Sequence, residues 1–137
     1  GQMKKAWMIA AWLVAGVAFG HGDVQPQAVN TDGLEPLGEE WLSQNPYSGN
    51  ELAIQVGASG YNQNCARCHG LEAISGGIAP DLRELGLGVE ADEWYIYRFR
   101  QGASQNGVYK MPPFENVLSQ EAAWAIRSYI EKRYEEM

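Results

Sequence analysis

Cys65-Ala66-Arg67-Cys68-His69 is the stretch of this 137-residue chain that decides its fold. On one helical turn, cysteines at positions i and i+3 present their sulfurs to the same side, where each can add to one vinyl group of a haem. The imidazole of His69 follows at once and can reach the iron. The pentapeptide therefore predicts one covalently attached haem c, bound through Cys65 and Cys68, with His69 as an axial ligand.

Two other uses of closely spaced cysteines fit the sequence less well. A redox disulfide of the thioredoxin type requires a strand before the motif in an α/β unit, whereas residues 50–64 have the pattern of a helix. A structural zinc site requires four ligands, and the chain offers only Cys65, Cys68, His69 and the distant His21. Haem attachment is the interpretation that these observations favour.

The second axial ligand is predicted by elimination. His21 would stand at the first position after a cleaved export signal, where a side chain is loosely held. The other methionines lie in that signal or at the end of the chain: Met3, Met8 and Met137. Met111 precedes Pro112-Pro113, which restrict the backbone and hold the thioether in place. We therefore expect Met111 to ligate the iron, although methionine is more commonly ordinary core filling.

The surroundings of the haem follow from what its ligands need. A metal-bound histidine usually donates its second ring N–H to a carbonyl or a carboxylate. The Ala79-Pro80 segment lies at a suitable distance along the chain to supply that carbonyl. The residues expected to wall the haem, each equally explained as plain core, are Leu82, Trp94, Tyr97 and Phe114.

Residues 1–20 have the three parts of a secretory signal. Met3-Lys4-Lys5 is basic, Ala6–Phe19 is apolar, and Ala18-Phe19-Gly20 offers a cleavage site with small residues. The apolar run is shorter than the roughly 20 residues that a membrane-spanning helix needs, which favours cleavage over a retained anchor. Gly1-Gln2 precede the expected start and are interpreted as a cloning scar.

The composition limits the partners of the exported domain. The full chain has 10 basic and 17 acidic side chains, and removal of Lys4 and Lys5 with the signal lowers the net charge from −7 to −9. An acidic domain is a poor candidate for binding nucleic acid or an anionic membrane. It suits docking on a positively charged protein surface, and the charge is equally explained by solubility.

The rest of the sequence predicts an all-α domain at residues 51–137, preceded by an extended arm at residues 21–50. Proline and glycine punctuate the arm, in which one helical turn is expected at residues 39–44. No segment shows the alternation typical of a strand. A flexible loop is expected before Met111, and longer helices are expected at residues 50–64, 92–101 and 119–134.

These features resemble the class I cytochromes c. The resemblance covers residues 51–134 and rests on Gly57…Tyr61…Cys65-x-x-Cys68-His69-Gly70, Ala79-Pro80-Asp81-Leu82, Met111-Pro112 and Trp124…Tyr129. It implies a fold in which the first and last helices cross near Gly57. It also implies that Pro80 supplies the carbonyl to His69 and that Met111 completes the iron coordination.

A narrower resemblance extends from Asn45-Pro46-Tyr47 through residues 57–82 and into the arm at residues 21–24. These segments resemble cytochrome c-550 of the periplasmic quinoprotein alcohol dehydrogenase systems. The resemblance implies that the chain accepts single electrons from the reduced cofactor PQQ of an ethanol-type or other alcohol dehydrogenase. It further implies that a terminal oxidase or another cytochrome accepts them.

We therefore expect a periplasmic monohaem electron carrier, not an enzyme, because the sequence shows no nucleophile–base pair and no open metal position. No nucleic acid and no stable membrane insertion after signal cleavage are expected. Two alternatives stay open. One is a haem enzyme or sensor in which a small ligand displaces Met111, and the other is a tethered redox subunit of a larger complex.

Overall fold

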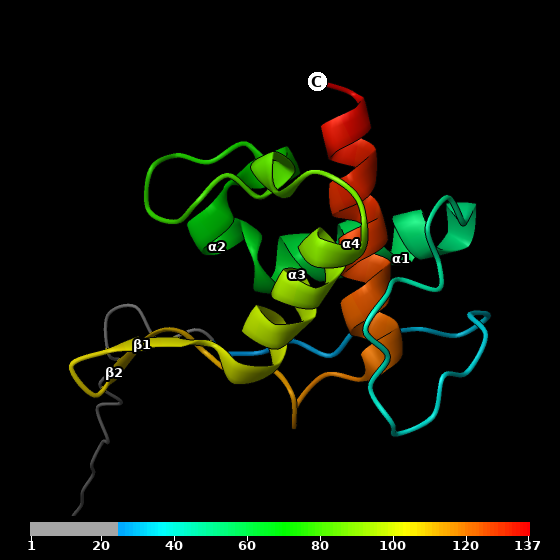
Figure 1. The fold of residues 1–137 in the computed structure, drawn as a ribbon, viewed down its shortest axis with the longest axis horizontal. Helices are drawn as coiled ribbons and strands as arrows, with labels where there is room; N and C mark the ends of the chain where they lie inside the picture. The colour runs from blue at the N-terminus through cyan, green and yellow to red at the C-terminus, as the bar shows by residue number, and fades with distance from the viewer. Residues whose placement is uncertain (1–24) are drawn as a thin grey trace, which may run out of the picture.

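The structure is a computed structural model that describes residues 25–137. The predicted signal at residues 1–20 and the first arm residues, 21–24, lie outside the described residues. The elements follow the order α1 (Glu51–Asn64), α2 (Ala66–His69), η1 (Leu71–Ala73), η2 (Leu82–Leu85), α3 (Val89–Gln101), β1 (Ala103–Gln105), β2 (Val108–Met111) and α4 (Gln120–Glu135). The prediction of a mostly helical domain is confirmed (Figure 1).

The two longest helices, α1 and α4, start where the sequence predicts and cross each other. The side chain of Asn50 accepts a hydrogen bond from the backbone N–H of Ala53 (3.0 Å), and Ser119 accepts one from Ala122 (3.1 Å). Both are N-caps that satisfy N–H groups otherwise left without a partner. The helices are in close contact at Gly57, where the backbone of α4 leaves no room for a side chain.

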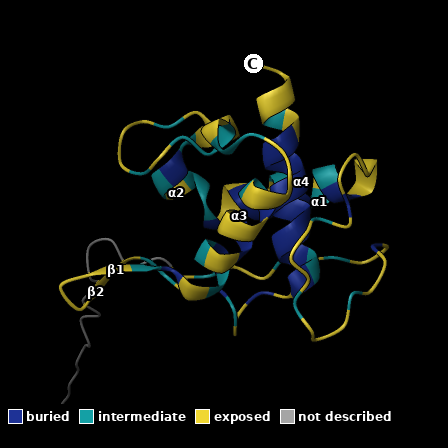
Figure 2. Ribbon diagram, viewed as in Figure 1, coloured by how far each residue is buried: buried dark blue, intermediate teal, exposed yellow. Residues whose placement is uncertain are grey.

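The core is built around α4, which is covered on most of its circumference (Figure 2). Its buried side chains include the large apolar ones of Trp124, Ile126, Tyr129 and Ile130. Neighbouring elements contribute aromatic rings to the same core. Tyr61 of α1 lies 5.3 Å from Tyr129, and Tyr95 of α3 lies 6.0 Å from Trp124, measured between ring centroids. Aromatic pairs at these distances add stability beyond the area that they bury.

Helix α3 begins three residues before the predicted start at residue 92. Gly88 precedes it with a φ of 107°, and Glu90 and Asp92 lie in its first turn, where the helix dipole favours negative charge. The helix ends as predicted, at Gly102, whose φ is 70°. Glycine adopts this left-handed conformation at no steric cost and is therefore common directly after a helix.

The flexible loop expected before Met111 is instead an antiparallel β-hairpin, so this part of the all-α prediction is wrong. Strands β1 and β2 are joined by Asn106 and Gly107, with φ values of 54° and 78°. Asn-Gly is the typical sequence of a type I′ turn, whose twist matches the paired strands. Figure 1 shows the hairpin extending away from the helices.

Residues 25–50 contain no helix or strand, so the helical turn predicted at residues 39–44 is also wrong. Side chains of the helices hold this arm through hydrogen bonds to its backbone. The carboxylate of Glu121 accepts from the N–H of Leu37 (2.6 Å), and Gln120 accepts from Leu42 (2.6 Å).

None of the helices within residues 25–137 is long and apolar enough to cross a membrane.

Candidate functional site

All six residues that the sequence assigns to the site line one cavity of about 520 Å³. They come from the motif turn, the loop that follows it and the end of β2, and they are Cys65, Cys68, His69, Pro80, Leu82 and Met111. The walls are mostly apolar, and the volume lies in the range typical of ligand sites. The fold therefore brings together side chains that are up to 46 positions apart in the sequence.

The motif forms one helical turn, as its spacing predicts. The N–H groups of Cys68 and His69 both donate to the carbonyl of Cys65, at 3.1 and 2.9 Å. Neither cysteine is in a disulfide. Burial raises the pKa of the Cys65 thiol to about 12. A redox-active cysteine pair instead requires a lowered thiol pKa, so this environment does not favour the thioredoxin alternative.

The chain turns sharply after the motif and is tied back to α1. The hydroxyl of Tyr61 donates to the carbonyl of Gly70 (2.7 Å). Gly70 has a φ of 89°, and a β-carbon there would collide with the carbonyl of Ile74. Glycine is therefore required directly after His69, where the backbone folds closely onto itself.

The imidazole of His69 has a defined tautomer. Its Nδ1 lies 2.8 Å from the carbonyl oxygen of Pro80, and because a carbonyl can only accept, Nδ1 carries the hydrogen. Burial lowers the pKa of His69, with the Pro80 contact acting in the opposite direction. The ring is therefore held neutral, with a lone pair on Nε2, which is the form that binds a metal.

Met111 is positioned by the elements on both sides of it. It is paired with Ala103 across the hairpin. Three residues later, the N–H of Phe114 donates to the carbonyl of Phe99 at the end of α3 (2.9 Å). The rings of Phe114 and Phe99 stack with centroids 5.3 Å apart. The segment that carries Met111 is thus fixed to β1 at one end and to α3 at the other.

Three of the four side chains expected to wall the haem border the cavity or the space beside it. Leu82 and Trp94 line it, and Phe114 lines a neighbouring space of about 40 Å³ that Met111 and His69 also border. Tyr97 was predicted wrongly, because 59% of its surface is exposed and it does not line the cavity. The sequence analysis missed several further lining side chains, among them Tyr95, Arg98, Lys110, Ile126 and Ile130. The i, i+4 spacing of Ile126 and Ile130, and of Trp94 and Arg98, was the available signal.

The residues present fit a haem. The cavity is apolar enough for a porphyrin, and it offers two thiols, an imidazole nitrogen and a thioether, which are the usual protein ligands of haem c. Arg98 and Lys110 also border it and are suited to the negative carboxylates that a haem carries. No ion pair of Lys110 is present within residues 25–137.

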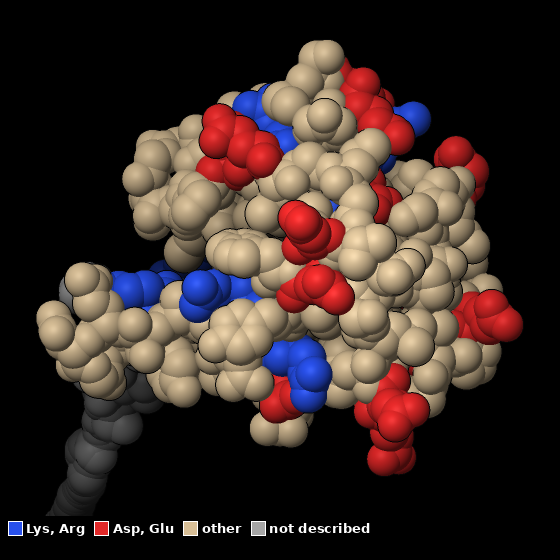
Figure 3. Space-filling view, viewed as in Figure 1, with Lys and Arg blue, Asp and Glu red and all other residues tan. Residues whose placement is uncertain are grey.

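The negative net charge is not spread evenly over the surface. On the face shown in Figure 3, one group of lysine and arginine side chains lies over the hairpin and the neighbouring part of α3, whereas the basic side chains at the top of the view lie among acidic ones and further acidic groups are scattered over the rest. The basic area coincides with the side of the cavity that Arg98 and Lys110 border. A partner that approaches this side therefore meets positive charge on an acidic protein.

Residues 52–130 match the protein family described as cytochrome c oxidase, cbb3-type, subunit III. Over 128 residues, the chain is 56% identical to cytochrome c550 of Pseudomonas aeruginosa, covering 90% of this chain and 88% of the relative. The chain belongs to the cytochrome c family. It therefore carries covalently bound haem c, and its single Cys-x-x-Cys-His motif makes it a monohaem electron carrier.

Two larger relatives match this cytochrome over a part of their length. The quinohemoprotein alcohol dehydrogenase ADH-IIG of Pseudomonas putida is 34% identical over 86 residues, which are 63% of this chain and 11% of the enzyme. FixP, a cbb3-type cytochrome c oxidase subunit of Rhizobium meliloti, is 28% identical over 117 residues, or 76% of this chain and 38% of the subunit. Comparison with solved structures gave no match.

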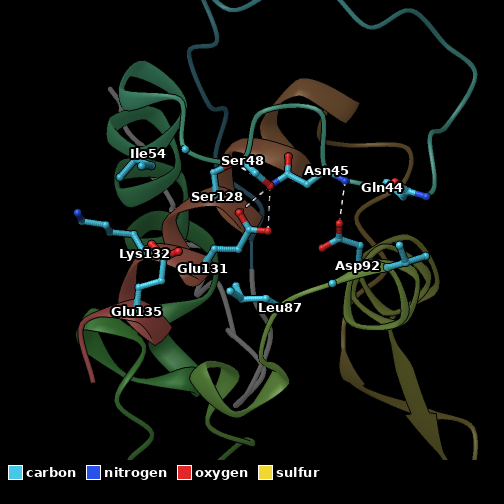
Figure 4. A pocket seen from close by; sticks show the side chains of 13 residues that line it. Gln44, Asn45, Ser48, Ile54, Leu87, Asp92, Ser128, Glu131, Lys132 and Glu135 are labelled. Carbon is cyan, nitrogen blue, oxygen red and sulfur yellow. Dashed lines mark hydrogen bonds between the residues drawn. The ribbon is translucent and has the colours of Figure 1, made fainter.

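A second cavity of this cytochrome, of about 310 Å³, shares no lining residue with the first (Figure 4). The backbone N–H of Asn45 donates to Asp92 (2.9 Å), while its side chain donates to Ser128 (2.9 Å) and Glu131 (3.2 Å). Ser48 also donates to Glu131 (3.1 Å). These bonds join the arm to α3 and α4, so the polar groups of this cavity serve the fold.

Proposed function

We propose that this cytochrome is a periplasmic carrier that accepts single electrons from a PQQ-dependent alcohol dehydrogenase. It passes them to a terminal oxidase or to another cytochrome, and it catalyses no reaction of its own. The observation that carries the proposal is the convergence of Cys65, Cys68, His69 and Met111 on one apolar cavity. Each of these side chains has a distinct part in the proposed site.

Cys65 and Cys68 would hold the cofactor through thioether bonds, and His69 and Met111 would ligate its iron. The haem supplies the exchange of one electron. Pro80 keeps Nε2 of His69 available by accepting from Nδ1. Leu82 and the other apolar walls exclude water from the site. Ligation of the iron by a thioether raises the reduction potential. When both ligand positions of the iron are filled by side chains, electron transfer is favoured over catalysis.

The alcohol dehydrogenase donor is supported by the relatives. The enzyme from Pseudomonas putida is by its name a quinohemoprotein, and a segment of it resembles this cytochrome. That enzyme therefore joins a cytochrome-like segment to an alcohol dehydrogenase in one chain. We infer that this cytochrome performs the same transfer as a separate protein.

Stopped-flow mixing tests the donor directly. The reduced quinoprotein alcohol dehydrogenase is mixed with the oxidised cytochrome, and haem reduction is followed by absorbance. We expect reduction to be much faster than with unrelated reduced donors of similar potential and charge. Equal rates with all donors would remove the alcohol dehydrogenase from the proposal.

The periplasmic location rests on the predicted signal at residues 1–20. Mass spectrometry of the protein recovered from the periplasm checks it. We expect a mass that corresponds to a start near His21 plus one haem. A retained N-terminal segment would instead favour the tethered subunit.

A further inference from the structure

Gly102 is buried at the junction of α3 and the hairpin. Its N–H donates to the carbonyl of Arg98 (2.8 Å), and its own carbonyl accepts from Nη1 of Arg98 (2.9 Å). Both backbone groups of Gly102 are therefore fixed by one residue of the last helical turn. The adjacent Phe99 is part of the core and anchors this end of α3.

The segment that carries Met111 lies directly against Gly102. A β-carbon built at Gly102 would collide with the carbonyl oxygen of Met111 and would lie 2.7 Å from the nitrogen of Pro113 and 2.8 Å from the carbonyl carbon of Pro112. Real β-carbons essentially never come this close to backbone atoms. The neighbouring atoms belong to backbone that two proline rings restrict, so they cannot move aside as a flexible side chain would.

Gly107 provides an internal comparison in the same hairpin. Its φ is 78°, against 70° for Gly102, so a side chain at either position is strained by a positive φ. A β-carbon at Gly107, however, has no atom within 4 Å. Only Gly102 combines the left-handed backbone with contact to the segment that carries Met111.

We propose that Gly102 is a positioning residue for Met111, because its bare α-carbon sets how closely the Met111–Pro113 backbone approaches α3 and thereby where the thioether lies. The inference rests on the proposed ligation of iron by Met111. A side chain at position 102 pushes the Met111 segment away from α3. The thioether then withdraws from the cavity, and the sixth position becomes accessible to small ligands.

Four variants of the haem-loaded protein test this: G102A and G102N, with G107A and G107N as matched controls. At Gly102 the φ of 70° is combined with a ψ of −165°, which essentially only glycine adopts, so both substitutions there strain the backbone. Backbone strain is therefore followed by the unfolding midpoint, and displacement of Met111 by the absorption band and the ligand affinity. The readouts are the weak sulfur–iron absorption band of the ferric protein, its affinity for azide or imidazole, and the midpoint of chemical unfolding. G102A adds the fewest atoms and is the milder test, and it is measured at low temperature if its unfolding midpoint falls.

We expect both Gly102 variants to lose intensity in the sulfur–iron band and to bind the added ligand about tenfold more tightly or more, since overpacking penalties of the usual size shift an equilibrium by that factor. The Gly107 variants should keep the native band and ligand affinity, even if their unfolding midpoints fall. Gly102 variants with the native band and affinity would overturn the proposal, as would equal changes at both glycines.

The variant M111A separates this proposal from the one on which it rests. If M111A loses the band and binds azide while the Gly102 variants do not, Met111 is the ligand and Gly102 does not position it. If M111A itself keeps the native band, the ligation of iron by Met111 is wrong, and the positioning role is overturned with it.

Discussion

The α-carbon of Gly57 in α1 packs against the carbonyl group of Ala125 in α4, at the point where the two longest helices cross. A β-carbon at Gly57 would overlap the carbonyl oxygen and carbon of Ala125 and lie 3.0 Å from the nitrogen of Ile126. Glycine in a helix costs up to about 1 kcal/mol relative to alanine. The chain accepts this cost because the crossing places Tyr61 against Tyr129 and orients the motif that follows α1.

Replacing Gly57 by alanine should therefore destabilise the protein although alanine is the better helix former. We expect a loss of about 3 kcal/mol in the free energy of unfolding, at the upper end of the usual range for overpacking. Urea unfolding of the holoprotein measures it. Gly76→Ala is the control, because a β-carbon at the exposed Gly76 has no atom within 4 Å. Equal losses in both variants would show that the crossing tolerates a methyl group.

The sequence predicts those parts of the fold that depend on local signals. Asn50 and Ser119 are N-caps that can be recognised from residue type, and the buried positions of α4 follow helical spacing. The hairpin was missed because strands of three and four residues are too short to show alternation. The Asn106-Gly107 pair was nevertheless a usable signal for a type I′ turn.

In the site, too, the sequence predicts the residues that a local motif marks and misses those brought together only by packing. The motif cysteines and His69 are adjacent in sequence, so their spacing alone indicates their chemistry. Arg98, Lys110 and Ile126 border the cavity only because α3, β2 and α4 are packed around it. Helical spacing places Ile126 and Arg98 on a face with their i, i+4 neighbours, but it does not show that these faces border the cavity. The arm is held by hydrogen bonds to side chains that are distant in sequence. Such contacts leave no local pattern, so the prediction of a helical turn in the arm was wrong.

Asn64 links the arm to the residue directly before the motif. Its carbonyl oxygen accepts from the N–H of Gln27 (2.7 Å), and its amide donates to the carbonyls of Gln27 (3.0 Å) and Gly60 (3.1 Å). We expect Asn64→Ala to lower the free energy of unfolding by about 1–3 kcal/mol, because buried backbone groups lose their partners. Limited proteolysis should also cut the arm faster. Gln63→Ala changes an exposed neighbour and should alter neither quantity.

Glu131 gives the stability a defined pH dependence. Burial, with a smaller contribution from Asp92, raises the pKa of Glu131 above its ordinary value of 4.5, while Ser48, Arg127 and Asn45 act in the opposite direction. Between 4.5 and the raised pKa, the folded protein binds a proton that the unfolded chain has released. The contribution of Glu131 to stability is therefore fully present below pH 4.5 and is lost as the pH rises through the raised pKa.

Glu131→Gln should remove this component, because the amide does not titrate. Urea unfolding at a series of pH values from 4 to about 8 gives the slope of stability against pH. We expect the variant to lose less stability than the wild type as the pH rises. Glu135→Gln removes the same charge at an exposed position of α4 and should keep the wild-type slope. Parallel slopes for wild type and Glu131→Gln would contradict the assignment.

Met111→Ala tests the proposed axial ligand most directly. The haem should stay attached, because the thioether bonds to Cys65 and Cys68 do not depend on Met111. The sixth position should open, so the ferric protein should lose its sulfur–iron band and bind azide or cyanide at low concentration. Its reduction potential should fall, because methionine ligation raises it. Met137→Ala, at an exposed position near the chain end, should leave all three properties unchanged. A native spectrum in Met111→Ala would exclude this residue as the ligand. Ready azide binding by the wild type would instead favour the haem enzyme or sensor over the electron carrier.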